Sequence, residues 1–414
     1  MLYRAFVRTS CRRLLSPAGS VPRITRPSCS STESPERTAL YDFHVSQGGK
    51  IVNFGGYLLP VQYSGQGIAA SHLHTRRHAS IFDVSHMLQT FIRGRDAIDC
   101  LESVCTADIR GLAPSSGTLT VFTNDRGGIL DDLIVSKVSS QILYVVSNAA
   151  MKSQDMAIMD AAACQFRAQG KDVFLEFLPT SERSLIAVQG PEAVSTVARL
   201  ATRQVDLSQL YFMSTVVTEI AGVAGCRITR CGYTGEDGLE ISVPSSEVRK
   251  VTEALLNASP TMKMAGLGAR DSLRLEAGLC LYGSDIDAQT TPIEASLAWL
   301  VAKRRRSELN FPGAEQICAQ IKSGVTRRRI GLLSTGTGVP PARAGVLIYH
   351  DDKHVGQITS GCPSPSLGRN IAMGYIAEEL KKPGVPVQLK IRGKLYPAKV
   401  AKMPFVPTHY YTKS

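Results

Sequence analysis

The stretch that decides the fold is GTLTVFTNDRGGILDDLIVSKVSSQILYVVSN, residues 117–148. Residues 119–123, 129–136 and 142–147 are rich in β-branched side chains, and the turn sequences NDRGG and VSSQ separate them. Runs of this composition, divided by turn-forming residues, predict three short β-strands joined by turns.

Two adjacent carboxylates, Asp131 and Asp132, lie inside the second of these strands between apolar neighbours. Because successive side chains of a strand alternate between its two faces, the two aspartates are expected to point in opposite directions. One of them can face water. The other then meets apolar surroundings, where an ionised carboxylate needs a polar or cationic partner. The alternation does not identify which aspartate takes part in chemistry, and a structural role for either stays open.

Helical and extended segments alternate on both sides of this stretch, with short turns between neighbouring strands. This order predicts an α+β fold with antiparallel sheets rather than a doubly wound parallel sheet. Helices are expected at 68–78, 97–109, 151–169 and 267–277. From residue 328 onward, six short strands separated by Gly and Pro predict a small β-barrel domain, with a boundary near 323–325.

Length and composition restrict the class of protein. A chain of 414 residues with 43% apolar side chains is expected to form two or three globular domains. No run approaches the roughly 18 apolar residues that a membrane helix needs. No GxGxxG or GxxxxGK[ST] loop occurs, which argues against a nucleotide enzyme. The chain has one tryptophan, Trp299, so stacking platforms for single-stranded nucleic acid are not expected.

Residues 1–32 contain six arginines among Ser and Leu, and no acidic residue precedes Glu33. This pattern is typical of a mitochondrial transit peptide. Its removal lowers the net charge from +12 to +6, and a mildly basic protein favours an acidic substrate or partner over nucleic acid. The eight cysteines beyond it include no CxxC pair, so we expect reduced, mostly buried thiols.

Two further motifs contain candidate binding residues. In CGYTGEDG, the glycines allow close approach of a flat ligand, and Glu236 beside Tyr233 could accept hydrogen bonds from the N–H edge of a heterocycle. A plain hairpin with a surface acid is the alternative. Arg270 and Arg274 lie four residues apart on a predicted helix, and paired arginines suit carboxylate recognition. Internal salt bridges are the alternative for that pair.

Histidines and basic runs give weaker indications. His72, His74 and His78 have no acidic third ligand nearby in sequence, so we expect surface or capping histidines and no metal site. The basic runs 303–306 and 327–329 are expected to be solvated faces, or else a docking patch for an acidic partner.

Six long motifs, taken together and in order, resemble one known family, the T-proteins (aminomethyltransferases) of the mitochondrial glycine cleavage system. They are FDVSHM (82–87), GTLTVFTNDRGGILDDLIV (117–135), TRCGYTGEDGLEIS (229–242), ARDSLRLEAGLCLYG (269–283), TSGCPSPSLGRNIAMGY (359–375) and KMPFVPTHYY (402–411). The resemblance runs from about residue 38 to the C-terminus. It implies a three-domain cloverleaf around a central channel. Two intertwined domains of the folate-binding aminomethyltransferase fold, each a helix-covered antiparallel sheet, would occupy 36–322, a β-barrel 326–405, and a tail closing on the folate site 406–414.

The same resemblance implies the site residues. Asp132, the second aspartate of GGILDD, corresponds to the proposed catalytic acid of the family. The tetrahydrofolate site would be formed by Leu119, Tyr144, Val146, Tyr233, Glu236, Arg270, Trp299 and Tyr410.

The implied reaction takes place in the mitochondrial matrix, in concert with the other glycine cleavage proteins. Ammonia leaves an aminomethyl group held on the lipoyl arm of the H-protein, and the one-carbon unit passes to tetrahydrofolate, giving 5,10-methylenetetrahydrofolate. The protein then needs neither a metal nor a covalent nucleophile, because the lipoyl and folate groups carry the reacting atoms.

Three other functions are possible from the sequence. A folate-binding protein of the same fold that aids iron–sulfur cluster assembly would resemble a KGCYxGQE motif, whereas this chain reads RCGYTGEDG. The folate half of a dimethylglycine or sarcosine dehydrogenase would need a flavin domain in front, for which we expect no room. An RNA-binding protein would need a recognised module, and none is evident.

Overall fold

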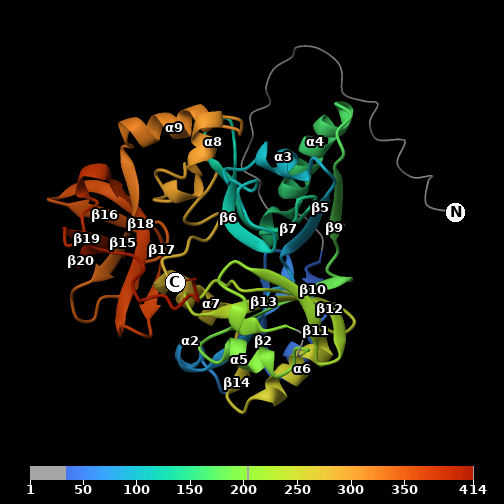
Figure 1. Cartoon of the computed structure of the whole chain (residues 1–414). Helices are drawn as coiled ribbons and strands as arrows, with labels where there is room; N and C mark the ends of the chain where they lie inside the picture. The colour runs from blue at the N-terminus through green and yellow to red at the C-terminus, as the bar shows by residue number, and fades with distance from the viewer. Residues whose placement is uncertain (1–33, 203–204, 414) are drawn as a thin grey trace. The chain divides into compact units, whose positions relative to one another are not determined.

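The computed structural model describes residues 34–202 and 205–413. From Pro35 onward the chain forms one compact unit that contains three sheets and a closed barrel (Figure 1). The fold is mixed α+β, as expected. The predicted transit peptide at 1–32 lies outside the described residues.

A five-stranded antiparallel sheet contains the stretch quoted at the start. Its strand order is β6-β7-β8-β5-β9, with bounds Ser116–Thr123, Ile129–Ser139, Ile142–Ser147, Leu88–Arg93 and Phe174–Leu178. All three predicted strands are confirmed, as β6, β7 and β8. Helices α3 (Ala97–Glu102) and α4 (Lys152–Ala168) pack their apolar side chains against the sheet.

Helix α3 ends at Glu102, so the helix predicted over 97–109 is too long. Side chains of the following turn take the place of helical hydrogen bonds. Glu102 Oε1 accepts from the Arg110 backbone N at 2.8 Å, and Asp108 Oδ1 accepts from the Gly111 backbone N at 2.8 Å. Acidic side chains that bond nearby backbone amides favour turns over continued helix.

A six-stranded sheet of order β11-β12-β13-β10-β4-β14 forms a second core with helices α5 and α6. Only its β14–β4 pair is parallel. A small sheet of order β1-β3-β2 lies beside helix α1. The bounds are β11 Thr215–Ile220, β12 Val223–Thr229, β13 Gly238–Pro244, β10 Arg183–Gln189, β4 Ala79–Asp83, β14 Met262–Met264, β1 Glu36–Arg37, β3 Tyr57–Tyr63, β2 Gly49–Phe54, α1 Tyr41–Ser46, α5 Ala193–Ala198 and α6 Val248–Ala258.

The six strands predicted after residue 328 close into an antiparallel barrel of order β15-β18-β17-β16-β19-β20. Closure removes the free edges that an open sheet would expose. The bounds are β15 Arg327–Ser334, β16 Leu347–His350, β17 Lys353–Ser364, β18 Arg369–Ala377, β19 Pro386–Ile391 and β20 Lys394–Ala401.

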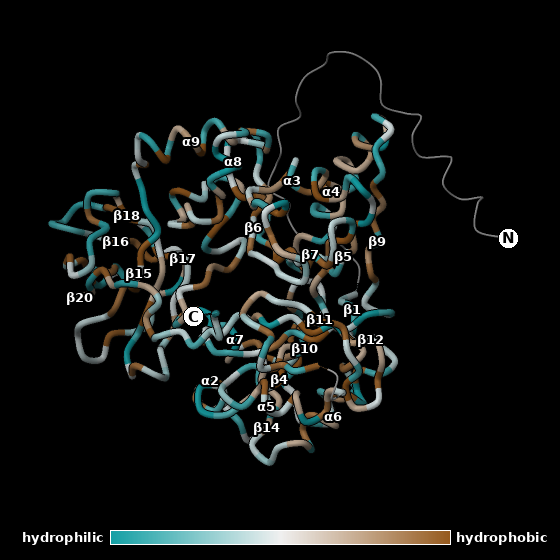
Figure 2. Tube along the Cα trace, viewed as in Figure 1, coloured by the Kyte–Doolittle hydropathy of each residue, from teal (hydrophilic) through white to brown (hydrophobic). Residues whose placement is uncertain are grey.

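The remaining helices connect these parts: α2 Ile68–Arg77, α7 Leu267–Glu276, α8 Lys303–Glu308, α9 Ala314–Ser323, and the 3₁₀ turns η1 Ala149–Met151, η2 Leu207–Gln209, η3 Ala298–Leu300 and η4 Glu378–Leu380. Hydrophobic and hydrophilic residues alternate along α9, as in an amphipathic helix that covers a core (Figure 2). In the described part of the chain, no helix is both long and apolar enough to span a membrane. The eight cysteines there are free, and five of them are buried.

His72 is buried, so the prediction of a surface or capping residue is wrong for this histidine. Its Nε2 lies 2.9 Å from Glu276 Oε2, and its Nδ1 lies 2.7 Å from Ser272 Oγ on α7. Arg76 also contacts Glu276, at 3.0 Å. Serines from β17 and the turn after it complete this network, Ser364 and Ser366 both donating to Glu276. It therefore joins α2 and α7 to the barrel.

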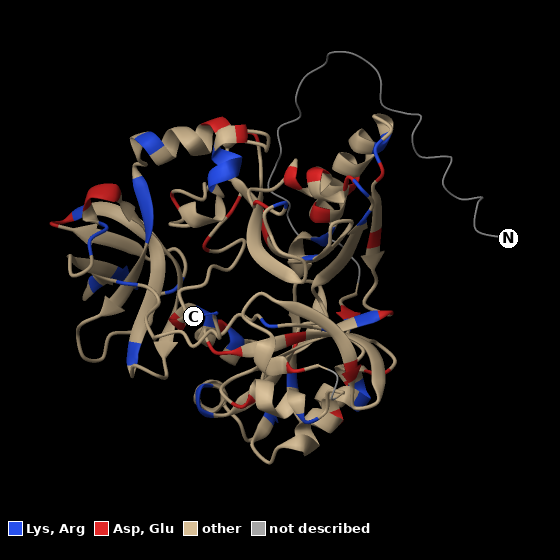
Figure 3. Cartoon of the chain, in the orientation of Figure 1, with Lys and Arg blue, Asp and Glu red and all other residues tan. Residues whose placement is uncertain are grey.

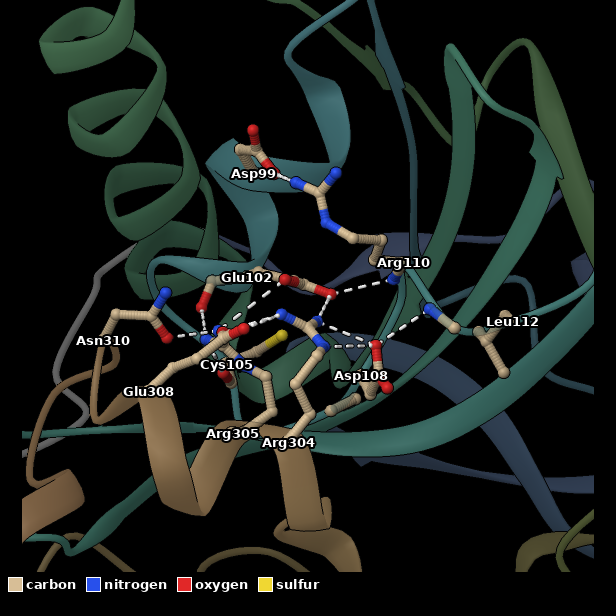
Figure 4. Close-up of polar contacts among 12 residues, drawn as sticks. Asp99, Glu102, Cys105, Asp108, Arg110, Leu112, Arg304, Arg305, Glu308 and Asn310 are labelled. Carbon is tan, nitrogen blue, oxygen red and sulfur yellow. Dashed lines mark hydrogen bonds and ion pairs between the residues drawn. The ribbon is translucent and has the colours of Figure 1, made fainter.

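Most arginines of the two basic runs have partners inside the molecule, so the prediction of solvated faces is wrong for these arginines, whereas Lys303 is exposed. Acidic and basic positions are interspersed along the chain (Figure 3). In the first run, Arg304 Nη2 lies 2.6 Å from Glu102 and 2.7 Å from Asp108 (Figure 4). Arg306 donates to the carbonyls of Val301 and Ala298. The second run behaves likewise, with partners Glu294, Glu378 and the Ala295 carbonyl.

Arg305 is fully buried at the centre of the first cluster. It donates to the carbonyls of Glu102 and Cys105 and pairs with Glu308 at 3.1 Å. These contacts hold α8 against the turn that follows α3.

We predict that Arg305→Met destabilises the protein by about 2–5 kcal/mol, because it leaves the buried carbonyls of Glu102 and Cys105 without their donor. Urea unfolding of the purified chain measures the change. Lys303→Met, at an exposed position of the same helix, is the matched control and should change stability little. Equal stability of Arg305→Met and the control would contradict this role.

Candidate functional site

A cavity of about 1080 Å³ lies between the five-stranded sheet, α7 with its following loop, and the barrel. Its wall includes seven of the residues predicted for the site: Leu119, Asp132, Val146, Tyr233, Arg270, Trp299 and Tyr410. These residues come from segments almost 300 positions apart. The volume and the mixture of apolar walls with a few charged groups are typical of a small-molecule site.

The two adjacent aspartates lie on opposite faces of β7, as predicted. Asp131 is fully buried in the direction of α4, whereas Asp132 is partly exposed and lines the cavity. Asn148, at the end of β8, reaches both carboxylates. Its Nδ2 donates to Asp132 Oδ1 at 2.9 Å and to Asp131 Oδ1 at 2.9 Å.

Burial raises the pKa of Asp132 to about 7, and the neighbouring Asp131 adds to this rise. In the described part of the chain no Lys, Arg or His forms an ion pair with Asp132. A carboxyl group with a pKa close to neutral pH can both accept and return a proton. Asp132 is thus suited to acid–base chemistry at the cavity wall.

Elsewhere the cavity wall contains polar groups, and two of their nitrogen atoms lack partners in the part of the chain that the structure describes. Arg270 Nη1 and His86 Nδ1 are buried and have no hydrogen-bond partner among the described residues. Arg270 lies over the Tyr233 ring, with its guanidinium carbon 4.8 Å from the ring centroid. Glu240 also lines the cavity, and burial raises its pKa. Burial and the charge of Arg270 lower the pKa of His86 to about 3, so this imidazole is neutral. A polar ligand would satisfy these groups.

Glu236 is not at the cavity wall, contrary to the prediction. Its carboxylate is 2% exposed and is held by Arg76 Nη1 at 2.9 Å and by His409 Nδ1 at 2.9 Å. Glu240, four residues later on β13, faces the cavity instead. The alternation of β13 could have indicated it, since Glu240 is the one acidic residue between buried Leu239 and Ile241.

Tyr144 is likewise absent from the cavity wall. It is buried behind the wall, where its hydroxyl donates to Gln89 Oε1 at 2.8 Å. Arg274, the second arginine of the predicted pair, is committed to Asp285 at 2.6 Å and to Asp271 at 2.9 Å. Among the described residues, no group of three or more His, Cys, Asp or Glu side chains could hold a metal ion.

The C-terminal tail contributes Tyr410 to the cavity and is held by aromatic contacts. Tyr410 stacks on Phe212 with ring centroids 4.4 Å apart, and Tyr411 stacks on Tyr211 at 5.4 Å. The backbone N of His409 donates to the Gly235 carbonyl at 2.8 Å. The tail therefore forms part of the site through the Thr234–Glu236 turn.

Comparison with known proteins identifies the family. Residues 40–305 match the GCVT N-terminal domain, and residues 327–407 match the glycine cleavage T-protein C-terminal barrel domain. The chain belongs to the glycine cleavage T-protein family. The human and mouse relatives, both named "Aminomethyltransferase, mitochondrial", are 51% and 52% identical over 393 and 389 residues. These alignments cover 94% of this chain in each case, and 95% and 94% of the relatives.

More distant members agree. A fission yeast relative, a "Probable aminomethyltransferase, mitochondrial", is 47% identical and covers 93% of this chain and 96% of its own length. The crystal structure of the glycine cleavage system aminomethyltransferase T from Bartonella henselae superposes with a TM-score of 0.83 at 36% identity, covering 92% of this chain and all of that one. As a member of this family the chain is an enzyme, an aminomethyltransferase of the glycine cleavage system. These relatives give no support to the iron–sulfur alternative.

We predict that Glu236→Gln loosens the tail without removing a cavity group. Losing charge from two hydrogen-bonded pairs should lower the free energy of unfolding by about 1.5–3 kcal/mol. Amide hydrogen exchange of residues 409–412 should become faster. Glu240→Gln is the matched control, because Glu240 makes no contact with the tail in this structure. Unchanged exchange in Glu236→Gln would show that the ion pair does not anchor the tail.

Proposed function

We propose that the cavity binds tetrahydrofolate and that Asp132 is the catalytic residue of one-carbon transfer to it. One observation carries this proposal: a carboxyl group with a pKa near 7 faces the same cavity as the Arg270 guanidinium and the Glu240 carboxyl group, which are half-buried and form no ion pair in the described part of the chain. A ligand that presents both N–H donors and oxygen or nitrogen acceptors fits these groups.

Glu240 and Arg270 are the groups suited to the pterin. The Glu240 carboxylate accepts from the amino and N–H edge of the ring, the role that the sequence suggested for Glu236. Arg270 donates to the acceptors of the same ring system. The buried Nη1 of Arg270 has no hydrogen-bond partner among the described residues, which costs free energy, so a ligand that supplies an acceptor there gains affinity. We assign the apolar and aromatic walls to Leu119, Val146, Tyr233, Trp299 and Tyr410.

Asp132 then performs the acid–base step. Its ionised form accepts the proton of the attacking folate nitrogen, and its negative charge stabilises the positive charge that develops as ammonia departs. Asn148 holds the carboxylate through its Nδ2, which fixes the direction of the reactive oxygen. The lipoyl and folate groups supply the reacting atoms, and the protein supplies position and charge.

The donor in this proposal is the aminomethylated lipoyl arm of the H-protein, and the products are ammonia, dihydrolipoyl H-protein and 5,10-methylenetetrahydrofolate. We place the reaction in the mitochondrial matrix, with residues 1–32 as the transit peptide. The catalytic region is assigned to residues 36–322, the barrel domain to 326–405 and the closing tail to 406–414.

Single-turnover ammonia release from aminomethylated H-protein, with and without tetrahydrofolate, tests this function. Folate-dependent release with methylenetetrahydrofolate as product is the expected result. Tight folate binding without turnover would instead favour a folate-binding role without catalysis.

We predict that Asp132→Asn retains tetrahydrofolate binding but lowers turnover by one to several orders of magnitude, because the amide cannot accept a proton. In the unmodified enzyme, turnover should fall as the pH drops below about 7, where Asp132 becomes protonated. Rapid-quench kinetics across a pH series measures both effects. Turnover of Asp132→Asn at the unmodified rate would remove the residue from the mechanism.

We predict that Glu240→Gln weakens tetrahydrofolate binding by about 10- to 100-fold, the value of a charged hydrogen bond. Isothermal titration calorimetry gives the dissociation constant directly. Glu219→Gln, at an exposed position on edge strand β11 of the same sheet, is the control and should bind normally. If Glu240→Gln binds tetrahydrofolate as tightly as the unmodified protein, another residue must accept the hydrogen bonds from the amino edge of the pterin.

A further inference from the structure

Two carboxyl groups that the proposed reaction does not use lie behind Asp132. Asp131 on β7 and Asp155 in the first turn of α4 are both fully buried. Asp155 receives no hydrogen bond from an N–H group among the described residues, and the polar groups within its reach are the Asp131 carboxyl group and the buried Ser147 hydroxyl. No ion pair joins Asp131, Asp132 or Asp155 to a basic side chain in that part of the chain.

One residue, Asn148, connects Asp131 to the cavity wall. Asp131 accepts from the Asn148 backbone N at 3.1 Å and from Asn148 Nδ2 at 2.9 Å. The same Nδ2 donates to the carboxylate and to the backbone carbonyl of Asp132, at 2.9 and 3.0 Å. A shift of the Asp131 carboxyl therefore moves the group that orients Asp132.

The other titratable groups around β7 do not compensate charge at this point. Tyr282 donates its hydroxyl to the Ile129 carbonyl at 3.2 Å, and burial together with the nearby aspartates raises its pKa. Asp287, whose carbonyl accepts from the Ile129 amide, adds a negative charge. The neighbours on β6, Val121 and Phe122, are apolar.

The carboxyl groups of Asp131 and Asp155 lie within hydrogen-bond reach of each other. Two neighbouring carboxyl groups that are buried without a cation do not both ionise at neutral pH. One must keep its proton and donate it to the other. In agreement, burial and then the charge of Asp155 raise the pKa of Asp131, and burial raises the pKa of Asp155. The pair titrates as a unit.

We propose that Asp131 and Asp155 share one proton at neutral pH and that this pair positions Asp132 through Asn148. The proton is held between the two carboxyl groups, so the pair carries a single negative charge behind the cavity wall. That charge disfavours ionisation of Asp132 and keeps its proton affinity suited to neutral pH. The proton sharing is independent of the function proposed above, whereas the effect on turnover rests on it.

The slope of the unfolding free energy against pH measures how many protons the folded protein binds beyond the unfolded chain, so it detects the shared proton. The unfolded chain ionises its aspartates near pH 4, so folding takes up one proton at the pair and stability falls as pH rises. From pH 6 to 8, this proton makes the unfolding constant rise tenfold per pH unit. In Asp155→Asn, the new amide donates to an ionised Asp131, so no proton is shared. The tenfold rise of the unfolding constant per pH unit that the shared proton causes should then be lost. Asp160→Asn, on the exposed side of α4, should retain it.

Equal pH dependence in Asp155→Asn and the unmodified protein would overturn the proposal. If Asp155→Asn does not fold, infrared spectra of the unmodified protein with carbon-13 aspartate give the answer. A carboxylic acid carbonyl band at pH 8 is expected, and its absence would overturn proton sharing.

The pH profile of single-turnover ammonia release tests the effect on Asp132. Below about pH 7 the rate should fall as Asp132 becomes protonated, and this fall is the acidic limb of the profile. Asp155→Asn keeps the negative charge on Asp131, so the acidic limb should stay at the same pH. Asp131→Asn/Asp155→Asn removes the charge and should move the limb about one pH unit lower. A purely structural role would reduce the rate without moving the limb, and an unmoved limb in the double variant would overturn the positioning role. Loss of the Asp132 mechanism alone would leave the proton count from unfolding unchanged.

Discussion

The site depends on the two-residue period of strand β7. Because neighbouring side chains point to opposite faces, Asp132 reaches the cavity while Asp131 is enclosed between the sheet and α4. Neither carboxyl group has a basic partner, and burial acts on both. A shift of one residue in the register of β7 would exchange the two aspartates, and the hairpins with β6 and β8 prevent that shift.

Charge inside the molecule is organised in two different ways. Where α2 meets α7, and where α8 meets the end of α3, arginines are paired with carboxylates, as in Arg76 with Glu276 and Arg304 with Glu102. These pairs fix the elements that surround the cavity. At the cavity itself, Arg270, Glu240 and Asp132 are left without ion pairs. Buried charges without partners lower stability, so their concentration at one place indicates a binding site.

Pattern reasoning succeeded where the signal is local. The strands of the barrel, β6 to β8, and the amphipathic helices follow from spacing within a few residues. It was wrong for His72 and for most arginines of the basic runs, and Glu236 does not line the cavity; the reason is common to all of them. Each of these side chains forms its hydrogen bonds or ion pairs with a residue from a distant segment. The local sequence gives no sign of such a partner, so it suggested exposure or ligand binding instead. His72 and Glu276, for example, are 204 positions apart in the chain.

The sequence by itself determined the α+β class, the barrel, the family and the adjacency of Asp131 and Asp132, because periodicity and motif order are properties of short stretches. Only the tertiary structure decided which carboxylates face the cavity and which are neutralised. It paired Glu236 with Arg76 and His409, left Glu240 facing the ligand space, and enclosed Asp131 with Asp155. Whether a charged group binds a ligand or stabilises the fold depends on which other charges lie within a few ångströms, and chain order does not fix that.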